Sequence, residues 1–386
     1  MPAAVVIGAG VVGASAAFHL AERGVETLVL DRAGPAAGST ARSGALVRAH
    51  YPTALEAELA WESLREYFEP WGERIGGGCG FTRTGFAYLV GEENTTALRH
   101  NVALGQSVGV ETEVISPDDL TGIDAALRPD GLALAAFEPR GGYADPTATA
   151  VGFLRAALRH GARFEKRLVT GLLEREGAVR GVETDNGQIE AEAVVLAAGA
   201  WSVPIAESVG LSLPITPARV GVALFERPYA LPTHLTVIDT TKGFYARPAA
   251  EYATLVGSRD SIRWLQRPDT PTPEPPKSFV EDVSRRLGQR LPPLAGARYR
   301  SGRSGILDMT PDGRPILGPE GPEGLYLAVG WSGTGFKKAP AVGAEVARWI
   351  STGASKRDEL ATYNLARFEK GALVRGEHEY ATVGPH

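Results

Sequence analysis

The sequence has a single cysteine, Cys79, among 386 residues, which excludes an intrachain disulfide. This scarcity fits a reducing compartment, and we predict a cytoplasmic protein. Cys79 lies among glycines with no neighbouring base, which favours a structural role. The seven histidines are scattered without the spacing of metal ligands, so no metal site is expected. No apolar run reaches membrane-spanning length, and the N-terminus lacks the basic region of a signal peptide.

An excess of positive charge is also absent. The chain has 40 Lys and Arg against 45 Asp and Glu, with a net charge of −5. This balance argues against general nucleic-acid binding. Hydrophobic residues make up 44% of the chain, as in ordinary globular proteins, and its length suffices for about two domains. There is no internal repeat or low-complexity tract.

The first 31 residues contain a nucleotide-binding pattern. An apolar run at residues 4–7 predicts a buried strand, and the glycine motif Gly8-Ala-Gly10-Val-Val-Gly13 follows at once. A helix of small and apolar residues comes next and ends at Gly24, before a second strand that leads into Asp31. Strand, glycines, helix, strand and acid in this order form the dinucleotide-binding fingerprint.

Each part of the fingerprint has its own physical reason. Gly8 permits a tight turn, Gly10 lets a pyrophosphate approach the backbone, and Gly13 allows helix and strand to pack closely. The helix N-terminus offers free N–H groups to phosphates, and Asp31 can accept hydrogen bonds from ribose hydroxyls. Two alternatives stay open: a βαβ unit whose glycines only form a turn, and an NAD-dependent dehydrogenase.

The remaining pattern predicts further elements along the chain. Helices are expected at 54–74, 92–108, 146–160, 277–291 and 341–350, the third with Asp145 as N-cap and Pro146 at its first position. Strands are expected at 81–90, 164–170, 171–175, 179–184, 193–198, 218–225, 235–239, 244–247, 252–257 and 325–329, and a loop at 270–276. A second glycine-rich turn, residues 330–340, opens the last helix, so another helix N-terminus points at a ligand.

Five segments together resemble the FAD-dependent amino-acid oxidase family, the group of D-amino-acid, glycine and sarcosine oxidases. They are residues 5–13 with Asp31, 38–44 (Gly-Ser-Thr-Ala-Arg-Ser-Gly), 194–202, 310–315 (Thr-Pro-Asp-Gly-Arg-Pro) and 330–337. The last of them, Gly-Trp-Ser-Gly-Thr-Gly-Phe-Lys, looks most like monomeric sarcosine oxidase and its dehydrogenase-subunit relatives.

The resemblance implies an α/β fold with a Rossmann-like FAD-binding domain and an α+β substrate domain whose sheet is mostly antiparallel. The FAD-binding domain would comprise residues 1–82, 143–214 and 305–368, and the substrate domain 83–142 and 215–304. The mixed-charge tail, 369–386, is predicted to be a disordered or loosely docked terminus, with a subunit interface as the alternative.

The resemblance also implies the residues that bind FAD. Val169 would face the adenine, residues 39–43 would line the pyrophosphate and flavin, and residues 333–337 would lie against the pyrimidine edge of the flavin. The full predicted set is Gly8, Gly10, Val12, Gly13, Asp31, Arg32, Ser39, Thr40, Arg42, Ser43, Val169, Gly199, Trp201, Gly333, Thr334, Gly335, Phe336 and Lys337.

Four residues are predicted to act on the substrate. By resemblance, Arg48 and Lys337 fall on the two carboxylate-binding positions, and Tyr245 resembles an active-site tyrosine; His50 follows Arg48 in the same motif. An arginine fork and an ammonium would hold an α-carboxylate over the flavin. Surface positions for the two cations, and a core position for Tyr245, are the structural alternatives.

Three departures from the family modify the expectation. Gly305 stands where sarcosine oxidases carry the cysteine that binds the flavin, and Arg42 stands at the histidine of the dimethylglycine dehydrogenases. We therefore predict non-covalent FAD. Leu255 stands at the lysine that activates oxygen in the oxidases, which makes a dehydrogenase with another electron acceptor plausible beside an O₂-using oxidase.

The predicted reaction is oxidation of the C–N bond of a small amino acid, a secondary amine such as sarcosine or proline. Hydride transfer to flavin N5 would give an imine, which water hydrolyses. One alternative is a 2-hydroxy-acid oxidoreductase with the same carboxylate clamp. The other is a flavin subunit that acts only with a partner chain.

Overall fold

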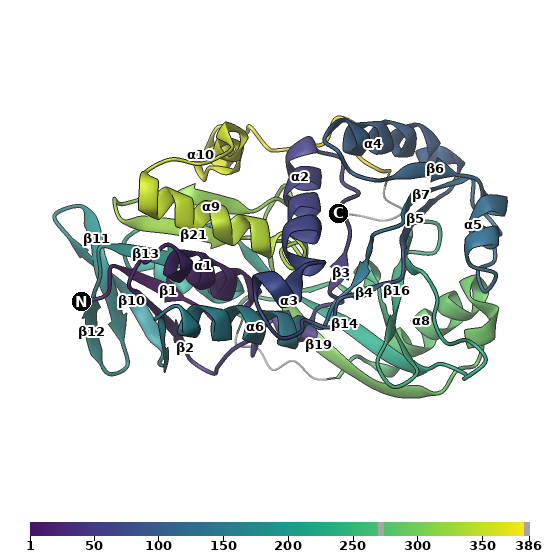
Figure 1. Cartoon of the computed structure of the whole chain (residues 1–386), viewed down its shortest axis with the longest axis horizontal. Helices are drawn as coiled ribbons and strands as arrows, with labels where there is room; N and C mark the ends of the chain where they lie inside the picture. The colour runs from purple at the N-terminus through teal and green to yellow at the C-terminus, as the bar shows by residue number, and fades with distance from the viewer. Residues whose placement is uncertain (269–273, 382–386) are drawn as a thin grey trace.

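The computed structural model describes residues 1–268 and 274–381. The predicted loop at 270–276 and the end of the predicted tail therefore lie partly outside the described residues. Figure 1 shows two sheet-based parts side by side, with α2 (Ala54–Ser63) between them. Several segments distant in sequence combine in each part.

A six-stranded sheet forms the centre of the first part, in the order β20-β21-β13-β1-β2-β9. Its strands are β1 (Ala4–Ile7), β2 (Thr27–Asp31), β9 (Arg163–Lys166), β13 (Ala193–Leu196), β20 (Ile316–Pro319) and β21 (Leu325–Val329). Every neighbouring pair is parallel except β20 with β21. β1 and β13 are buried along their whole length, as a parallel strand covered on both faces requires.

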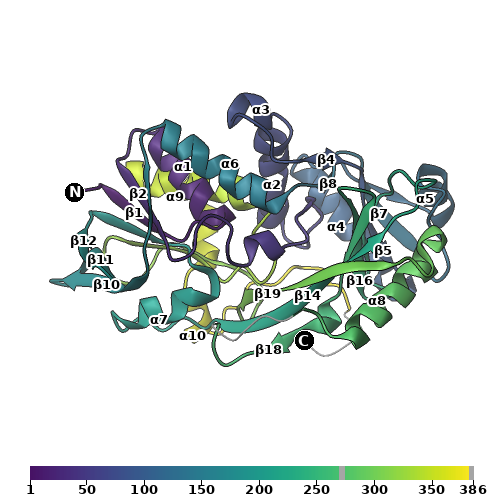
Figure 2. The ribbon, with the colours of Figure 1, turned by 90° about the horizontal axis from the view of Figure 1, so that it is seen from below.

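Helices cover one face of this sheet and a small antiparallel sheet covers the other. α1 (Val11–Glu22), α6 (Pro146–Arg159) and α9 (Ala339–Thr352) pack together on the first face (Figures 1 and 2). On the second face, β10 (Val169–Arg175), β11 (Ala178–Thr184) and β12 (Gly187–Glu190) bury apolar residues against β1 and β2, with α7 (Ser202–Glu207) beside them. α1 and α9 approach closely because a Cβ at Gly343 would lie 2.7 Å from the carbonyl carbon of Ser15.

A nine-stranded, mostly antiparallel sheet forms the second part. Its main path is β18-β14-β17-β16-β15-β5-β7-β6, and β19 pairs with β14. The strands are β5 (Phe86–Val90), β6 (Glu113–Ile115), β7 (Leu134–Glu138), β14 (Thr216–Glu226), β15 (Thr236–Asp239), β16 (Phe244–Ala249), β17 (Ala253–Gly257), β18 (Arg263–Trp264) and β19 (Tyr299–Met309). α8 (Lys277–Arg290) packs its apolar side, Phe279, Val283 and Leu287, onto the sheet. α4 (Thr95–Ser107) packs on Val90 of β5 and Ala136 of β7, and α5 (Pro117–Ile123) lies next to α8 (Figure 1).

Along the chain, blocks of strands of the six-stranded sheet thus alternate with blocks of the nine-stranded sheet, and β19 contains the predicted boundary between residues 304 and 305. The division into two domains itself stays a prediction. The fold class, an α/β fold with parallel and antiparallel sheets, is confirmed.

Three predicted elements differ from those observed. Residues 81–90 form two strands, because the chain turns at Gly85 (φ +75°) from β4 (Thr82–Arg83) to β5. β4 belongs to a small sheet with β3 (Leu46–Val47) and β8 (Gly142–Tyr143). The predicted helix 54–74 comprises α2, a π-helical segment at Leu64–Phe68 and α3 (Trp71–Arg74). The predicted strand 164–170 ends early, as β9, and Val169 instead begins β10.

The C-terminal segment also differs from the prediction of a disordered or loosely docked terminus. After α10 (Ala366–Glu369), residues 370–381 cross from the first part to α4 in the second (Figure 1). The Asn101 side chain donates a 2.9 Å hydrogen bond to the carbonyl of His378, and Ala381 N donates one of 2.8 Å to Asn94 Oδ1. Hydrogen bonds to the backbone do not require apolar residues at regular spacing. The sequence of the segment therefore did not predict that it docks on α4.

Candidate active site

A cavity of about 1910 Å³ extends along the junction of the two parts. A single small-molecule ligand commonly occupies a pocket of about 300–1,000 Å³, so this one has room for a dinucleotide and a substrate. It brings together all but one of the predicted site residues: Gly8, Gly10, Val12, Asp31, Arg32, Ser39, Thr40, Arg42, Ser43, Arg48, His50, Val169, Gly199, Trp201, Tyr245, Gly333, Thr334, Gly335, Phe336 and Lys337. The exception is Gly13.

Glycines at the start of α1 shape one end of the cavity. Gly8 has φ +105°, and a Cβ there would lie 2.9 Å from the carbonyl carbon of Ala197. A Cβ at Gly13 would overlap the carbonyl oxygen of Gly8, so Gly13 permits contact between α1 and β1 without facing the cavity. The amide of Val11 donates a 3.1 Å hydrogen bond to Thr40 Oγ1, which makes Thr40 a remote partner for the first turn of α1.

Asp31 holds the loop that follows β2. Its carboxylate accepts hydrogen bonds from Ala9 N at 2.9 Å and from Ala33 N and Gly34 N, both at 2.8 Å. A carboxylate has about four acceptor positions, so three backbone donors leave room for one ribose hydroxyl rather than two. The predicted ribose contact is therefore compatible with the geometry, beside a structural role that the sequence did not indicate.

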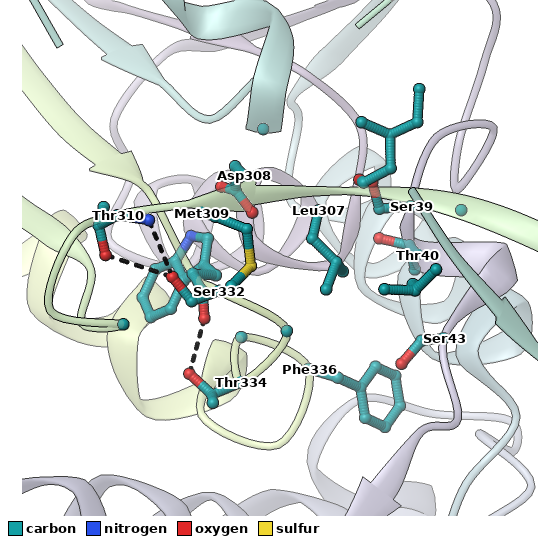
Figure 3. Close-up of a pocket in the computed structure, with 18 of the residues that line it drawn as sticks. Ser39, Thr40, Ser43, Leu307, Asp308, Met309, Thr310, Ser332, Thr334 and Phe336 are labelled. Carbon is teal, nitrogen blue, oxygen red and sulfur yellow. Dashed lines mark hydrogen bonds between the residues drawn. The ribbon is translucent and has the colours of Figure 1, made fainter. Parts of the chain in front are cut away.

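The loop of residues 38–44 crosses the middle of the cavity. Ser39 donates a hydrogen bond to the carbonyl of Ile306 on β19, and Arg42 donates one of 2.7 Å to the carbonyl of Gly38. Figure 3 shows Ser39, Thr40 and Ser43 on one side of Leu307 and the Thr310–Ser332 pair on the other. A Cβ at Gly305 would lie 3.0 Å from Arg42 Cβ, so the Arg42 side chain packs against Gly305.

The second glycine-rich turn, residues 330–338, is held from beneath by β19. Asp308 accepts a 2.8 Å hydrogen bond from Gly330 N, and Ser332 Oγ accepts one of 3.1 Å from Thr310 N (Figure 3). Burial raises the pKa of Asp308 to about 6. These bonds fix the turn that carries residues 333–337 along the cavity wall toward α9.

Arg48 and Lys337 form a pair of inward-facing cations. The guanidinium carbon of Arg48 lies 4.4 Å and Lys337 Nζ lies 6.0 Å from the ring centroid of Tyr51, so the two charges lie near the same aromatic ring; Lys338 Nζ lies 5.0 Å from that centroid. Burial, and next the charge of Arg48, lower the pKa of Lys337 well below its usual range. Within residues 1–268 and 274–381 neither cation has an acidic partner; Arg48 donates only to the carbonyl of His50. Lys337 is buried and Arg48 is half-buried, and cavity cations without a counter-ion are a site for an anion.

The nearest carboxylates are engaged elsewhere. Glu56 accepts a 2.8 Å hydrogen bond from Lys338 Nζ and pairs with Arg314 Nε at 2.8 Å. Glu138 Oε2 accepts a 2.8 Å hydrogen bond from Ala49 N, and burial raises the pKa of Glu138 to about 7 against the opposing effect of the Arg48 charge. The sequence did not reveal these acids, because only the fold brings them near Arg48 and Lys337.

Tyr245 and His50 both lie in the cavity wall, where His50 is buried and Tyr245 is half-buried. Burial raises the pKa of Tyr245 to about 12, and its ring fills the space beside Gly257, where a Cβ would overlap it. Burial lowers the pKa of His50 to about 3, so its imidazole is neutral. His50 Nε2 lies 2.5 Å from the hydroxyl of Tyr380 in the C-terminal segment, a contact that the sequence did not predict.

Two other sequence interpretations concern residues outside the cavity. Cys79 is buried away from it, and burial raises the pKa of its thiol to about 11. Leu255 lies in the core of the large sheet, opposite Leu224 and Arg247.

In the described part of the chain there is no cluster of three or more His, Cys, Asp or Glu that could hold a metal ion. The same residues include no helix long and apolar enough to cross a membrane.

Comparison with known proteins gives a consistent result. The model of the FAD dependent oxidoreductase (DAO) family matches residues 3–349. Mitochondrial sarcosine dehydrogenase of Mus musculus is 26% identical over 408 residues; the alignment covers 99% of this chain but only 44% of that protein. The chain thus spans less than half of that relative's length. Glycine oxidase of Geobacillus kaustophilus is 25% identical, with 94% of this chain and 96% of that one covered.

A solved structure shares nearly the whole fold. The crystal structure of L-proline dehydrogenase from P. horikoshii superposes with a TM-score of 0.89 and is 28% identical in sequence. The superposition covers 96% of this chain and 98% of that one. The likeness therefore includes both sheet-based parts of the chain.

Proposed function

The chain belongs to the FAD dependent oxidoreductase family, and within it we propose that the protein oxidises a small amino acid, a secondary amine of the sarcosine or proline kind. Its similarity to sarcosine dehydrogenase and L-proline dehydrogenase supports this class. The observation that carries the proposal is the pair Arg48 and Lys337, two cavity cations with no acidic partner among the described residues.

The cavity fits FAD. Gly8 and Gly10 leave the backbone bare at the N-terminus of α1, where N–H groups and the helix dipole favour a pyrophosphate. Asp31 has acceptor capacity for a ribose hydroxyl, and Val169 presents an apolar surface for the adenine. The turn at residues 333–337 would lie along the flavin, whose bound ring supplies the acceptor for two electrons and a proton.

The substrate side of the mechanism depends on orientation. Arg48 and Lys337 would bind the α-carboxylate, each charge-assisted bond contributing about 1.5–3 kcal/mol. With the carboxylate held, the C–H bond beside nitrogen is fixed in one direction, and positioning supplies much of the rate. Tyr51 and Tyr245 exclude water from this region, which strengthens the attraction between carboxylate and cations. The amine reacts in its neutral form, and water then hydrolyses the imine.

The proposal extends to the electron acceptor. Leu255, which takes the position of the oxygen-activating lysine, is apolar and buried in the sheet. We therefore propose a dehydrogenase that transfers electrons to an acceptor other than O₂, with a partner subunit as one such acceptor.

An anaerobic titration of the purified holoenzyme tests the proposal. The visible flavin band is followed while sarcosine, L-proline, glycine, D-alanine and, as the competing class, L-lactate are added. Bleaching by a secondary amine, followed by slow recovery in air and fast recovery with an artificial dye, is the expected result. Bleaching by lactate alone would establish a hydroxy-acid oxidoreductase instead, and rapid recovery in air would establish an oxidase.

A further inference from the structure

The C-terminal segment lines the cavity with Tyr380, together with Leu373, Val374, Arg375, Glu379 and Ala381. Tyr380 lines the same cavity as Arg48 and Lys337, and its hydroxyl lies 2.5 Å from His50 Nε2. His50 in turn receives a hydrogen bond from Arg48 at its backbone carbonyl. Tyr380 is thus separated from the carboxylate-binding arginine by a single residue.

Contacts on both sides of the cavity hold this segment in place. Toward the first part, Val374 N donates a 3.1 Å hydrogen bond to Asp312, and Glu379 pairs with Arg314 at 2.9 Å. Toward the second part, the ring of His378 stacks on that of His100 at 3.8 Å between centroids. Together with the bonds of Asn94 and Asn101, these contacts fix the segment at two ends, with Tyr380 near one of them.

Tyr380 completes a wall of three rings. Its centroid lies 4.7 Å from that of Tyr88 and 5.9 Å from that of His50, and the His50 and Tyr88 centroids are 4.9 Å apart. The imidazole is neutral because of its lowered pKa, so the wall carries no charge to compete with the two cations. The ring planes are tilted by 33–39° to one another, and the wall offers a largely apolar aromatic surface beside the proposed carboxylate site.

We propose that Tyr380 is a specificity-determining residue: from the C-terminal segment it closes the substrate chamber and packs against the side chain or ring of the amino acid. This rests on the proposed function, since it assumes that Arg48 and Lys337 bind the carboxylate. A largely apolar aromatic wall favours a cyclic amino acid of the proline kind over glycine or sarcosine, whose small substituents cannot cover it.

Ligand binding to the holoenzyme, read from the shift of the visible flavin band, tests the proposal without turnover. The probes are pyrrole-2-carboxylate, a flat carboxylate that cannot be oxidised as an amine, and acetate, which has no ring. For Tyr380→Ala we expect Kd for pyrrole-2-carboxylate to rise at least tenfold and Kd for acetate to change less than threefold. Tyr380→Phe, which keeps the ring, should stay within threefold for both. Glu377→Ala is the matched control, because that side chain is 86% exposed on the same segment.

Turnover provides a second readout. The ratio of kcat/KM for L-proline to that for sarcosine should fall at least fivefold in Tyr380→Ala and stay unchanged in Glu377→Ala. If Tyr380→Ala loses its flavin or its thermal transition, Tyr380→Leu is used in its place. The expected result is the same: Kd for pyrrole-2-carboxylate rises more than Kd for acetate. A purely structural role would weaken both probes equally, or neither, and would overturn the inference.

Arg48→Ala separates the two proposals. It should weaken both carboxylates together, since both need the arginine. If Arg48→Ala leaves both Kd values unchanged, the proposed carboxylate site is wrong. If it weakens both while Tyr380→Ala fails to distinguish them, the site stands and the role of Tyr380 is refuted.

Discussion

Lys338 donates a 2.8 Å hydrogen bond to the buried carboxylate of Glu56, whereas the neighbouring Lys337 has no acidic partner among the residues described. Two consecutive lysines are thus divided between two roles. Lys338 completes a buried ion pair that joins α2 to the start of α9. Lys337 directs its ammonium toward the cavity, and its lowered pKa makes its charge sensitive to what binds there.

The first prediction follows from this lowered pKa. A bound carboxylate stabilises the ammonium, so binding takes up a proton wherever free Lys337 is neutral. The affinity of the holoenzyme for acetate should therefore fall as the pH rises above the lowered pKa of Lys337. In Lys337→Met the affinity should be lower at neutral pH and nearly independent of pH between 7 and 9. Lys356→Met, at a side chain that is 56% exposed, is the control; an equal pH dependence in wild type and Lys337→Met would contradict the assignment.

Arg48 gives the second prediction. Replacing it with alanine removes the guanidinium fork, and the loss of about 1.5–3 kcal/mol should raise KM for the amine substrate about 10- to 100-fold. The melting temperature should change much less than it does for a core substitution. Steady-state kinetics and a thermal melt measure the two effects. An unchanged KM would remove Arg48 from the site, and Arg65→Ala, at a side chain that is 54% exposed, controls for general loss of charge.

Glu138 gives the third prediction. An unfolded glutamate ionises near 4.5 and Glu138 in the fold near 7, so between these values the folded state holds more protons. The free energy of unfolding therefore falls as pH rises across this window, by on the order of 3 kcal/mol. Glu138→Gln removes this contribution. The free energy of unfolding of the variant minus that of the wild type should therefore be more favourable at pH 8 than at pH 5. Denaturant unfolding at both pH values measures it; part of the slope persists because the pKa of Asp308 is also raised.

The contact between α1 and α9 gives the fourth prediction. A Cβ at Gly343 would lie 2.7 Å from the carbonyl carbon of Ser15 and 2.8 Å from Ala16 N, so alanine there must push the helices apart. Gly343→Ala should lower the free energy of unfolding by about 1–3 kcal/mol or more. Gly72→Ala is the matched control, because its Cβ would meet no atom closer than 3.8 Å. Equal stability of the two variants would show that the helices can move apart freely.

The fifth prediction concerns the attachment of FAD. Gly305 has no side chain to form a bond, and Cys79 does not line the cavity. Acid precipitation of the holoenzyme should leave all the flavin in the supernatant and none in the pellet, as absorbance near ~450 nm would show. Flavin retained in the washed pellet would reveal a covalent link.

Local patterns in the sequence were enough to predict the strand–helix–strand unit at residues 4–31. The order of strand, glycines, helix and Asp31 depends on neighbouring residues, and β1, α1 and β2 form where that pattern predicts them. The Asp145 cap likewise accepts a 2.7 Å hydrogen bond from Ala148 N. Local chemistry of this kind, turns, caps and apolar periodicity, requires no knowledge of distant segments.

Tertiary structure decided the substrate side. Which of two adjacent lysines would meet Glu56, and that Tyr380 would reach His50 across 330 positions, depends on the packing of segments far apart in the chain. A single tyrosine in a polar tail has no periodicity to mark it. By itself the sequence therefore determined the fold class and the FAD cofactor, and it led to the proposal that Arg48 and Lys337 are the two cations of the site. Only the fold decided which charges are already paired and which side chains close the chamber, because burial and pairing are properties of the assembled three-dimensional structure.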